Sequence, residues 1–204
     1  MSAARRLLAA SCLALLSASA GVDAAVVCSA QQDIDVPQDG EGVYLNFVTG
    51  VHAGSEGAVP GFDFDPYAAQ SSNPANQLKF YWGSSANGGG GVASAGDVYA
   101  VLAPGDTIGA ASLFTRAGFT GDTSAWQAGI DGYLGVRFTN EATTAINYGW
   151  VRLSTTAPLG FPATIVEWCY EDGGGDIEIA AEPADAIFCD GFDETACTAG
   201  AGGG

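Results

Sequence analysis

GYLGVRFT, at residues 132–139, is the first of three neighbouring segments in which apolar residues recur at alternate positions; NYGWVRLS (147–154) and ATIVEWCY (163–170) follow it. A period of two places successive side chains on opposite faces of a β-strand, so each segment is predicted to be a half-buried strand. The connections between them are polar or contain proline and glycine, which is typical of turns. The three segments therefore predict a meander of antiparallel strands.

The meander is predicted to gather charged and aromatic side chains on one face. If the first connection closes symmetrically, Arg137 lies opposite Trp150. If the second does so, Trp150 lies opposite Glu167, and Arg152 shares their face. A guanidinium over an indole contributes about 0.5–1 kcal/mol when exposed, and a nearby carboxylate adds a charge pair.

Two interpretations of this face stay open. Cross-strand pairs of this kind stabilise a sheet, which is the first interpretation. The second is a ligand platform of aromatic and charged groups. The residues assigned to that platform are Trp126, Tyr148, Trp150, Arg137, Arg152 and Glu167. For the tryptophans, burial in the core is the other interpretation, because large aromatic side chains are usually buried.

The first residues of the chain have the pattern of a secretory signal peptide. Arg5 and Arg6 precede a short apolar run at residues 7–16, and small residues follow. The run is too short to span a membrane. Residues 22–24 or residues 18–20 offer a cleavage site with small side chains. We therefore expect an exported protein, secreted or periplasmic, with no transmembrane segment.

The charge balance argues against some classes of partner. The chain contains 6 Lys and Arg against 23 Asp and Glu, a formal net charge of −17. Nucleic acids and anionic membrane surfaces repel such a protein, so neither is an expected partner. The acidity either keeps the protein soluble outside the cell or serves to bind cations.

Four cysteines lie beyond the predicted leader: Cys28, Cys169, Cys189 and Cys197. An even number in an exported chain predicts disulfides, and three pairings exist. We favour Cys28–Cys169, which ties the N-terminal segment to the meander, and Cys189–Cys197, which closes a short loop. In the chain-entropy model the first disulfide contributes roughly 4–5 kcal/mol.

Composition outside the meander predicts the fold class. Thirty glycines, eight prolines and short apolar runs without a helical period indicate an all-β protein, an antiparallel β-sandwich or jelly roll. We expect a signal peptide at 1–24, a single sandwich domain at 25–180, and a linker with a cystine-loop tail at 181–204. A strand at 62–65 is expected to end at Pro66, and the glycine run at 88–91 is expected to be a loop.

The chain has no motif of a common hydrolase. Its single histidine, His52, lies in a glycine-flanked loop, so a Ser-His-Asp or Cys-His site is not indicated. Glycoside hydrolysis needs only two carboxylates, and Glu167 is the one candidate on a predicted sheet face. No cofactor is expected, with calcium as the alternative because it prefers oxygen ligands on flexible loops. Its candidate ligands are Asp33, Asp35, Asp39 and Glu41.

The runs GYLGVRF (132–138), YGWVRL (148–153) and EWCYE (167–171) resemble a group of uncharacterised exported bacterial β-sandwich proteins. Some members of that group are surface proteins with a Pro-Glu-Pro C-terminal sorting signal, which this chain lacks. The resemblance implies a fold and an exported location, and it implies no activity. The run at 187–192 is similar to a terminal motif of assorted secreted proteins of gamma-proteobacteria.

These observations favour a secreted, disulfide-stabilised, non-enzymatic interaction or matrix protein. Its expected partner is an extracellular polysaccharide or an envelope protein. The first alternative is a carbohydrate-binding module, with or without calcium, that uses the aromatic side chains of the platform. The second alternative is a glycan-active hydrolase.

Overall fold

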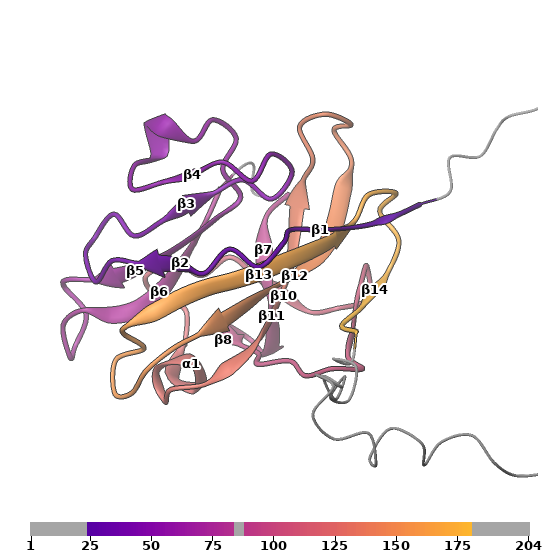
Figure 1. Ribbon diagram of the computed structural model, residues 1–204. Coiled ribbons are helices and arrows are strands. Elements are labelled where there is room, and N and C mark those ends of the chain that lie inside the picture. Colours follow the sequence, from indigo (N-terminus) through magenta and orange to yellow (C-terminus); the bar gives the residue numbers. More distant parts are fainter. Residues whose placement is uncertain (1–23, 84–87, 181–204) are drawn as a thin grey trace, which may run out of the picture.

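β-Strands make up almost all the regular structure of residues 24–83 and 88–180, the parts of the chain that the computed structural model describes (Figure 1). Antiparallel sheets pack together into a β-sandwich-like single domain, which confirms the predicted fold class. Two short helical turns, η1 (Glu56–Ala58) and α1 (Ser124–Gln127), lie between strands. Within the described ranges, no helix has the length and apolar character needed to cross a bilayer.

The largest sheet has eight strands and is built around the predicted meander. Its three long strands are β11 (Asp131–Thr139), β12 (Ile146–Ser154) and β13 (Ala163–Glu171). The shorter members are β1 (Val26–Cys28), β2 (Ile34–Val36), β7 (Gly90–Ala95), β8 (Val98–Tyr99) and β10 (Phe114–Thr115). β1 and β2 both pair with β13, and β7 pairs with β11, so the meander forms the centre of the sheet.

A four-stranded sheet packs against one face of the meander. Its strands, in the spatial order β4-β3-β5-β6, are β3 (Tyr44–Leu45), β4 (His52–Ala53), β5 (Phe64–Ala69) and β6 (Gln77–Trp82). A separate ribbon of two strands consists of β9 (Thr107–Ile108) and β14 (Ile177–Glu178). The ribbon belongs to neither of the larger sheets.

The meander is covered on both faces. Its inner side chains, among them Leu134, Val151 and Ile165, join the four-stranded sheet in the main apolar core. On the other face a second apolar cluster forms beneath the β9–β14 ribbon, which contributes Ile108 and Ile177. A sheet face predicted to meet solvent is therefore partly enclosed.

The first hairpin of the meander departs from symmetric closure. Arg137 lies opposite Tyr148, not opposite Trp150 as predicted. The connection is shifted because the backbone N–H of Thr144, a residue with φ 60°, folds back to the carbonyl of Asn140 at 2.7 Å. The connection therefore comprises residues 140–145, and Ile146, which was predicted to lie in it, begins β12.

The second hairpin also differs from the prediction. Trp150 lies opposite Cys169, and Arg152 lies opposite Glu167. The register shifts between Arg152 and Leu153, at a bulge of the kind that adds one residue to one strand of a pair. The predicted face survives, because residues directly opposite each other on neighbouring strands share a face.

The disulfide predicted between Cys28 and Cys169 is present. The two cysteines are direct partners in the pairing of β1 with β13. The disulfide fixes the N-terminal strand to the last strand of the meander. Cys189 and Cys197, for which the second disulfide is predicted, lie outside the described residues.

Two local expectations are wrong. Pro66 does not end a strand but lies inside β5, where it pairs with Phe80. The glycine run does not form only a loop, because Gly90 and Gly91 begin β7 and pair with β11. A side chain at Gly91 would collide with the rings of Trp82 and Tyr99, so the close approach of the sheets requires glycine there.

Candidate functional site

The β9–β14 ribbon covers the centre of the predicted ligand platform. Trp150 is 7% exposed and packs edge-on against Tyr133, with 5.1 Å between the ring centroids. Trp126, in α1, is 0% exposed and packs against Phe80 in the main core. Neither tryptophan ring is available to a surface ligand in the way that the predicted platform requires.

Tyr148 and Arg137 stay near the surface of the sheet. The ring of Tyr148 lies 5.9 Å from that of Phe114, and the guanidinium of Arg137 lies 4.8 Å from the centre of the Phe114 ring. All three side chains are half-buried. They form a small stack at the edge of the second cluster, in which the arginine packs as well as carries charge.

Arg152 bridges two carboxylates. Its Nε donates to Oδ1 of Asp131 at 2.8 Å and its Nη2 donates to Oδ2 at 3.1 Å, while its Nη1 lies 3.5 Å from Oε1 of Glu167. The ion pair between Arg152 and Glu167 agrees with the interpretation of this face as stabilising cross-strand pairs. Asp131 was not predicted as a partner of Arg152, because it lies one residue before the segment that shows clear alternation.

A polar hollow of about 590 Å³ lies beside Arg152 and is called the Arg152 basin here. Residues of two separately predicted sites line this hollow. Asp33 and Asp35 belong to the predicted calcium loop, and Arg152 belongs to the predicted ligand platform. The full lining consists of Gln31, Asp33, Asp35, Asp131, Arg152, Ser154, Thr164 and Val166. The basin offers carboxylates and hydroxyls around one guanidinium.

The predicted calcium ligands do not converge. Asp39 turns its Oδ1 to the backbone N–H groups of Glu41 and Gly42, each at 3.0 Å, and neither Asp39 nor Glu41 lines the basin that holds Asp33 and Asp35. Across residues 24–83 and 88–180, no three His, Cys, Asp or Glu side chains are placed to hold a metal ion. The Asp39 carboxylate instead stabilises the turn that leads into β3.

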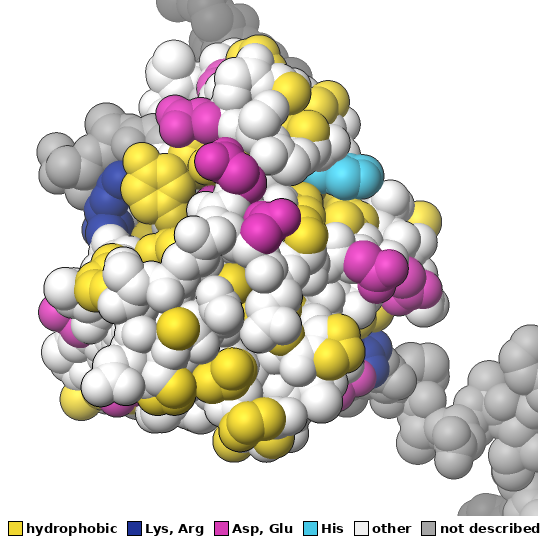
Figure 2. Space-filling model, turned by 90° about the vertical axis from the view of Figure 1, so that its left-hand side faces the viewer, with side chains coloured by type: hydrophobic (Ala, Val, Ile, Leu, Met, Phe, Trp, Pro, Cys, Tyr) yellow, Lys and Arg dark blue, Asp and Glu magenta, His cyan; other side chains and the backbone are white. Residues whose placement is uncertain are grey.

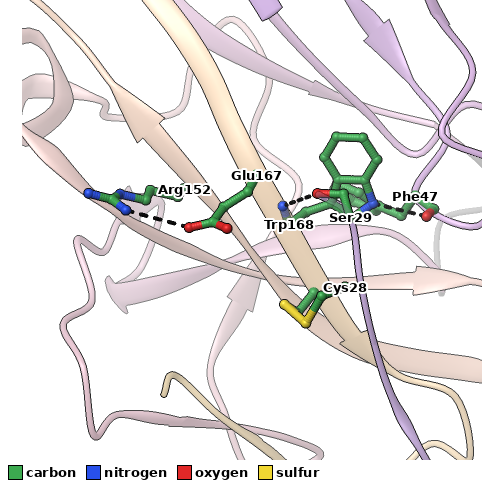
Figure 3. The surroundings of a disulfide bond; sticks show 7 residues. Cys28, Ser29, Phe47, Arg152, Glu167 and Trp168 are labelled. Carbon is green, nitrogen blue, oxygen red and sulfur yellow. Dashed lines mark hydrogen bonds and ion pairs between the residues drawn. A yellow bond between two sulfur atoms is a disulfide. The ribbon is translucent and has the colours of Figure 1, made fainter. Parts of the chain in front are cut away.

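A second hollow lies at the open flank of the sandwich, between β1 and the turn that follows β3. It has a volume of about 350 Å³, with Trp168 and Tyr170 of β13 at its base and Val48 and Gly50 on the opposite wall. Trp168 holds the two sides together, because its Nε1 donates to the Phe47 carbonyl at 3.0 Å. Figure 3 shows Trp168 directed toward Phe47, while the neighbouring Glu167 turns the other way, toward Arg152.

A third hollow, of about 500 Å³, adjoins the second one. The two share Val48 and Tyr170, and together they form the flank groove. The added lining residues are Ala24, Asn140, Ala142, Thr143, Asp172 and Gly173. The groove therefore runs from β1 to the tip of the β11–β12 hairpin, with an apolar base and polar rims.

The wall of the groove is a well-bonded turn. Oδ1 of Asn46 accepts hydrogen bonds from the backbone N–H groups of Val48 and Thr49 at 3.0 and 2.9 Å. Gly50 follows at φ 70°, a backbone conformation that favours glycine. These contacts hold Val48 in place before any ligand arrives.

Asp63 lies behind this wall. It is 1% exposed, and its Oδ2 accepts the backbone N–H of Phe47 at 2.9 Å. Its Oδ1 has no hydrogen-bond partner among the described residues. Burial raises the pKa of Asp63 to about 8, with a smaller contribution from the charge of Glu141, so the carboxyl is protonated at neutral pH.

Asp65 occupies a similar position two residues along. It is 2% exposed, and its Oδ1 also lacks a partner within the described chain. Its pKa is raised to about 8, mainly by burial and to a smaller extent by the charges of Glu41, Asp39 and Glu56, against the opposing effect of the Val43 N–H. The surface over the four-stranded sheet is itself rich in acidic side chains and poor in basic ones (Figure 2).

No family model, curated protein or solved structure matches the chain. The resemblance to exported bacterial β-sandwich proteins therefore stays a prediction. The case for a functional site depends on the geometry of the molecule itself.

Most residues of the flank groove carry no sequence signal of a binding site. Trp168 and Tyr170 showed only the alternation of a half-buried strand. No local signal links residues 46–50 to the segment around β1, because the groove arises where distant parts of the chain meet.

Proposed function

We propose that this chain is an exported, non-enzymatic binding protein that holds an extended ligand in the flank groove. The observation that carries the proposal is that the two hollows adjoin, because Val48 and Tyr170 line both. A concave surface with an apolar base and a few polar groups at its rim is the usual form of a binding site. Its elongated course suits a polysaccharide chain or an extended segment of an envelope protein.

The chemistry of the lining supports binding without turnover. Among the described residues of the groove, Asp172 is the one carboxylate, whereas glycoside hydrolysis needs a facing pair. Glu167, the carboxylate named from the sequence, lies on the other face of β13 and is engaged with Arg152.

The disulfide supports an extracytoplasmic location. Cys28 and Cys169 form a bond that persists in oxidising compartments and is rare in the cytosol of most organisms. The signal-peptide pattern at the start of the chain also supports an extracytoplasmic location. Cell fractionation, with the mass of the protein recovered from each fraction, tests it.

The binding proposal is tested with an array of glycans, exopolysaccharides and peptides, run in calcium and again in chelator. Two variants of the same connection serve as a matched pair. Val48→Arg fills the groove, whereas Val51→Arg changes an exposed side chain that does not line it.

We expect an array ligand that the Val48→Arg variant loses and the Val51→Arg variant keeps. Equal retention by both variants would place the binding surface elsewhere. Turnover of a glycan that disappears with a single carboxylate substitution would contradict the non-enzymatic proposal.

A further inference from the structure

The N-terminal end of β1 lies against a carboxylate. The backbone nitrogen of Ala25 is 2.7 Å from Oδ1 of Asp172, and the backbone N–H of Asp172 donates to the Ala25 carbonyl at 3.0 Å. The pairing of β1 with β13 begins next to this contact, where Val26 lies opposite Glu171. In the precursor, the Ala25 nitrogen belongs to a peptide bond and carries one hydrogen and no charge.

We propose that removal of the export leader after Ala24 turns this nitrogen into an ammonium group that forms an ion pair with Asp172. The inference rests on the proposed export of the chain. Hydrolysis of the Ala24–Ala25 bond by a signal peptidase consumes one water. It leaves a carboxylate on Ala24 and an amine on Ala25 that takes up a proton at neutral pH.

The position of the contact selects between the two cleavage sites of the sequence. Cleavage after Ala24 creates the charge at the atom that already contacts Asp172. Cleavage after Ala20 would leave extra residues in front of Ala25 and carry the charge away from the carboxylate. A hydrogen bond between two charged groups is shorter and stronger than one made by a neutral amide.

The ion pair acts on a strand that has few other contacts. β1 has three residues, all exposed, and among the described strands its backbone pairs with β13 alone. Chain termini fray unless they are tied down. The ammonium would fasten the free end of β1, while the disulfide at Cys28 fastens its other end.

Processing would also reshape the flank groove. Ala24 lines the end of that groove, close enough that a Cβ on Gly173 would lie 2.7 Å from the Ala24 Cβ. Removal of Ala24 takes away this wall. The mature groove would therefore end at an ammonium–carboxylate pair, which offers a charged anchor to the end of a ligand.

The test compares two forms of the domain with oxidised disulfides. One begins at Ala25, made with a protease that leaves no extra residue, and the other retains residues 23–24. Each is prepared with and without Asp172→Asn. We expect the substitution to lower the Tm more in the form that begins at Ala25, and the α-amine of that form to titrate at higher pH with Asp172 than with asparagine.

An equal loss of Tm in both forms, together with an α-amine titration that Asp172→Asn leaves unchanged, would overturn the ion pair. If the substituted protein fails to fold, acetylation of the Ala25 amine replaces it, and the expected result is a lower Tm. An unchanged Tm after acetylation would overturn the proposal as well.

The mass of the exported protein tests the cleavage step separately. A mature chain that begins at Ala25 is expected, and one that begins at Gly21 would overturn the inference. A full-length chain retained inside the cell would instead contradict the proposed function, while the comparison of purified domains would still decide the ion pair.

Discussion

The meander and the four-stranded sheet share one core, but the Arg152 cluster of the first contrasts with the two buried aspartates of the second. In the meander, Arg152 meets the carboxylates of Asp131 and Glu167 near solvent. In the four-stranded sheet, Asp63 and Asp65 are buried, and each leaves one oxygen without a hydrogen-bond partner in the described chain. Buried polar atoms are nearly always bonded, so the second arrangement has a cost that the first avoids.

The difference assigns separate roles to the two regions. The meander supplies long paired strands, the disulfide and the base of the flank groove. The four-stranded sheet supplies the opposite wall through the turn that follows β3, and Asp63 bonds the backbone of that turn at Phe47. The stability of the wall should therefore depend on pH, whereas that of the base should depend on covalent and apolar contacts.

The largest expected effect comes from the disulfide. Replacement of both Cys28 and Cys169 by alanine should lower the free energy of unfolding by about 4–5 kcal/mol in the chain-entropy model, because the bond closes a very long loop. Denaturant unfolding of the oxidised protein and of the variant measures the difference. The variant treated with reductant is the control for any other disulfide, and an unchanged midpoint in the double variant would show that the meander does not depend on this bond.

The next effect concerns the buried carboxyls. Between pH 4 and pH 8 the unfolded chain releases a proton that folded Asp63, with its pKa of about 8, still holds. The free energy of unfolding should therefore fall as pH rises, by roughly 1 kcal/mol per pH unit at most for each such carboxyl. Above pH 8 the native carboxyl ionises too, and the decline ends.

Asp63→Asn and Asp65→Asn test this expectation, because asparagine resembles a protonated carboxyl at all pH values. Each variant should flatten the decline and exceed the wild type in stability near pH 8. Urea unfolding from pH 5 to pH 9 measures it. If the free energy of unfolding changed with pH in the same way in the variants and the wild type, the buried carboxyls would not cause the decline. The contrast between the two sheets would then be lost.

The contrast also shows what sequence can reveal about this fold. The three strands of the meander were predictable because nine-residue strands repeat the alternating pattern many times. The burial of Asp63 and Asp65 was not, because alternation with phenylalanine is equally typical of a half-exposed strand. Contacts from residues outside the strand, such as Phe47 with Asp63, decide the outcome.

The cover over Trp150 could not be predicted for a similar reason. Trp150 was correctly placed on the outer face of the meander, but β9 and β14 enclose that face with two residues each. Strands so short carry no periodic signal. The disulfide was predictable because cysteine chemistry restricts the partners, whereas the flank groove arises where distant segments meet and nothing local marks it.

A smaller effect is expected where the two sheets meet. A Cβ on Gly91 would lie 2.7 Å from Cζ2 of Trp82 and 2.8 Å from Cε1 of Tyr99, so Gly91→Ala should destabilise the protein by about 1–3 kcal/mol. Gly57→Ala is the matched control, because no heavy atom lies within 4 Å of its Cβ. Thermal unfolding at one pH compares them. Equal Tm values would mean that the sheets can separate without cost at this point.

The smallest effect is expected at the ion pairs of Arg152. Asp131 meets the guanidinium with both oxygens, at 2.8 and 3.1 Å, whereas Oε1 of Glu167 lies 3.5 Å from its Nη1. Asp131→Asn should therefore cost more than Glu167→Gln, although both should stay below about 1 kcal/mol because all three side chains are partly exposed.

Double-mutant cycles with Arg152→Ala, run at low and high salt, measure the two couplings. Screening by salt should reduce both, because solvent reaches the pairs. A Glu167 coupling of several kcal/mol that salt does not reduce would mean that the meander also contains tightly held charge. The two sheets would then differ only in whether their carboxylates have partners, and the pH dependence of the groove wall would follow from missing partners rather than from burial alone.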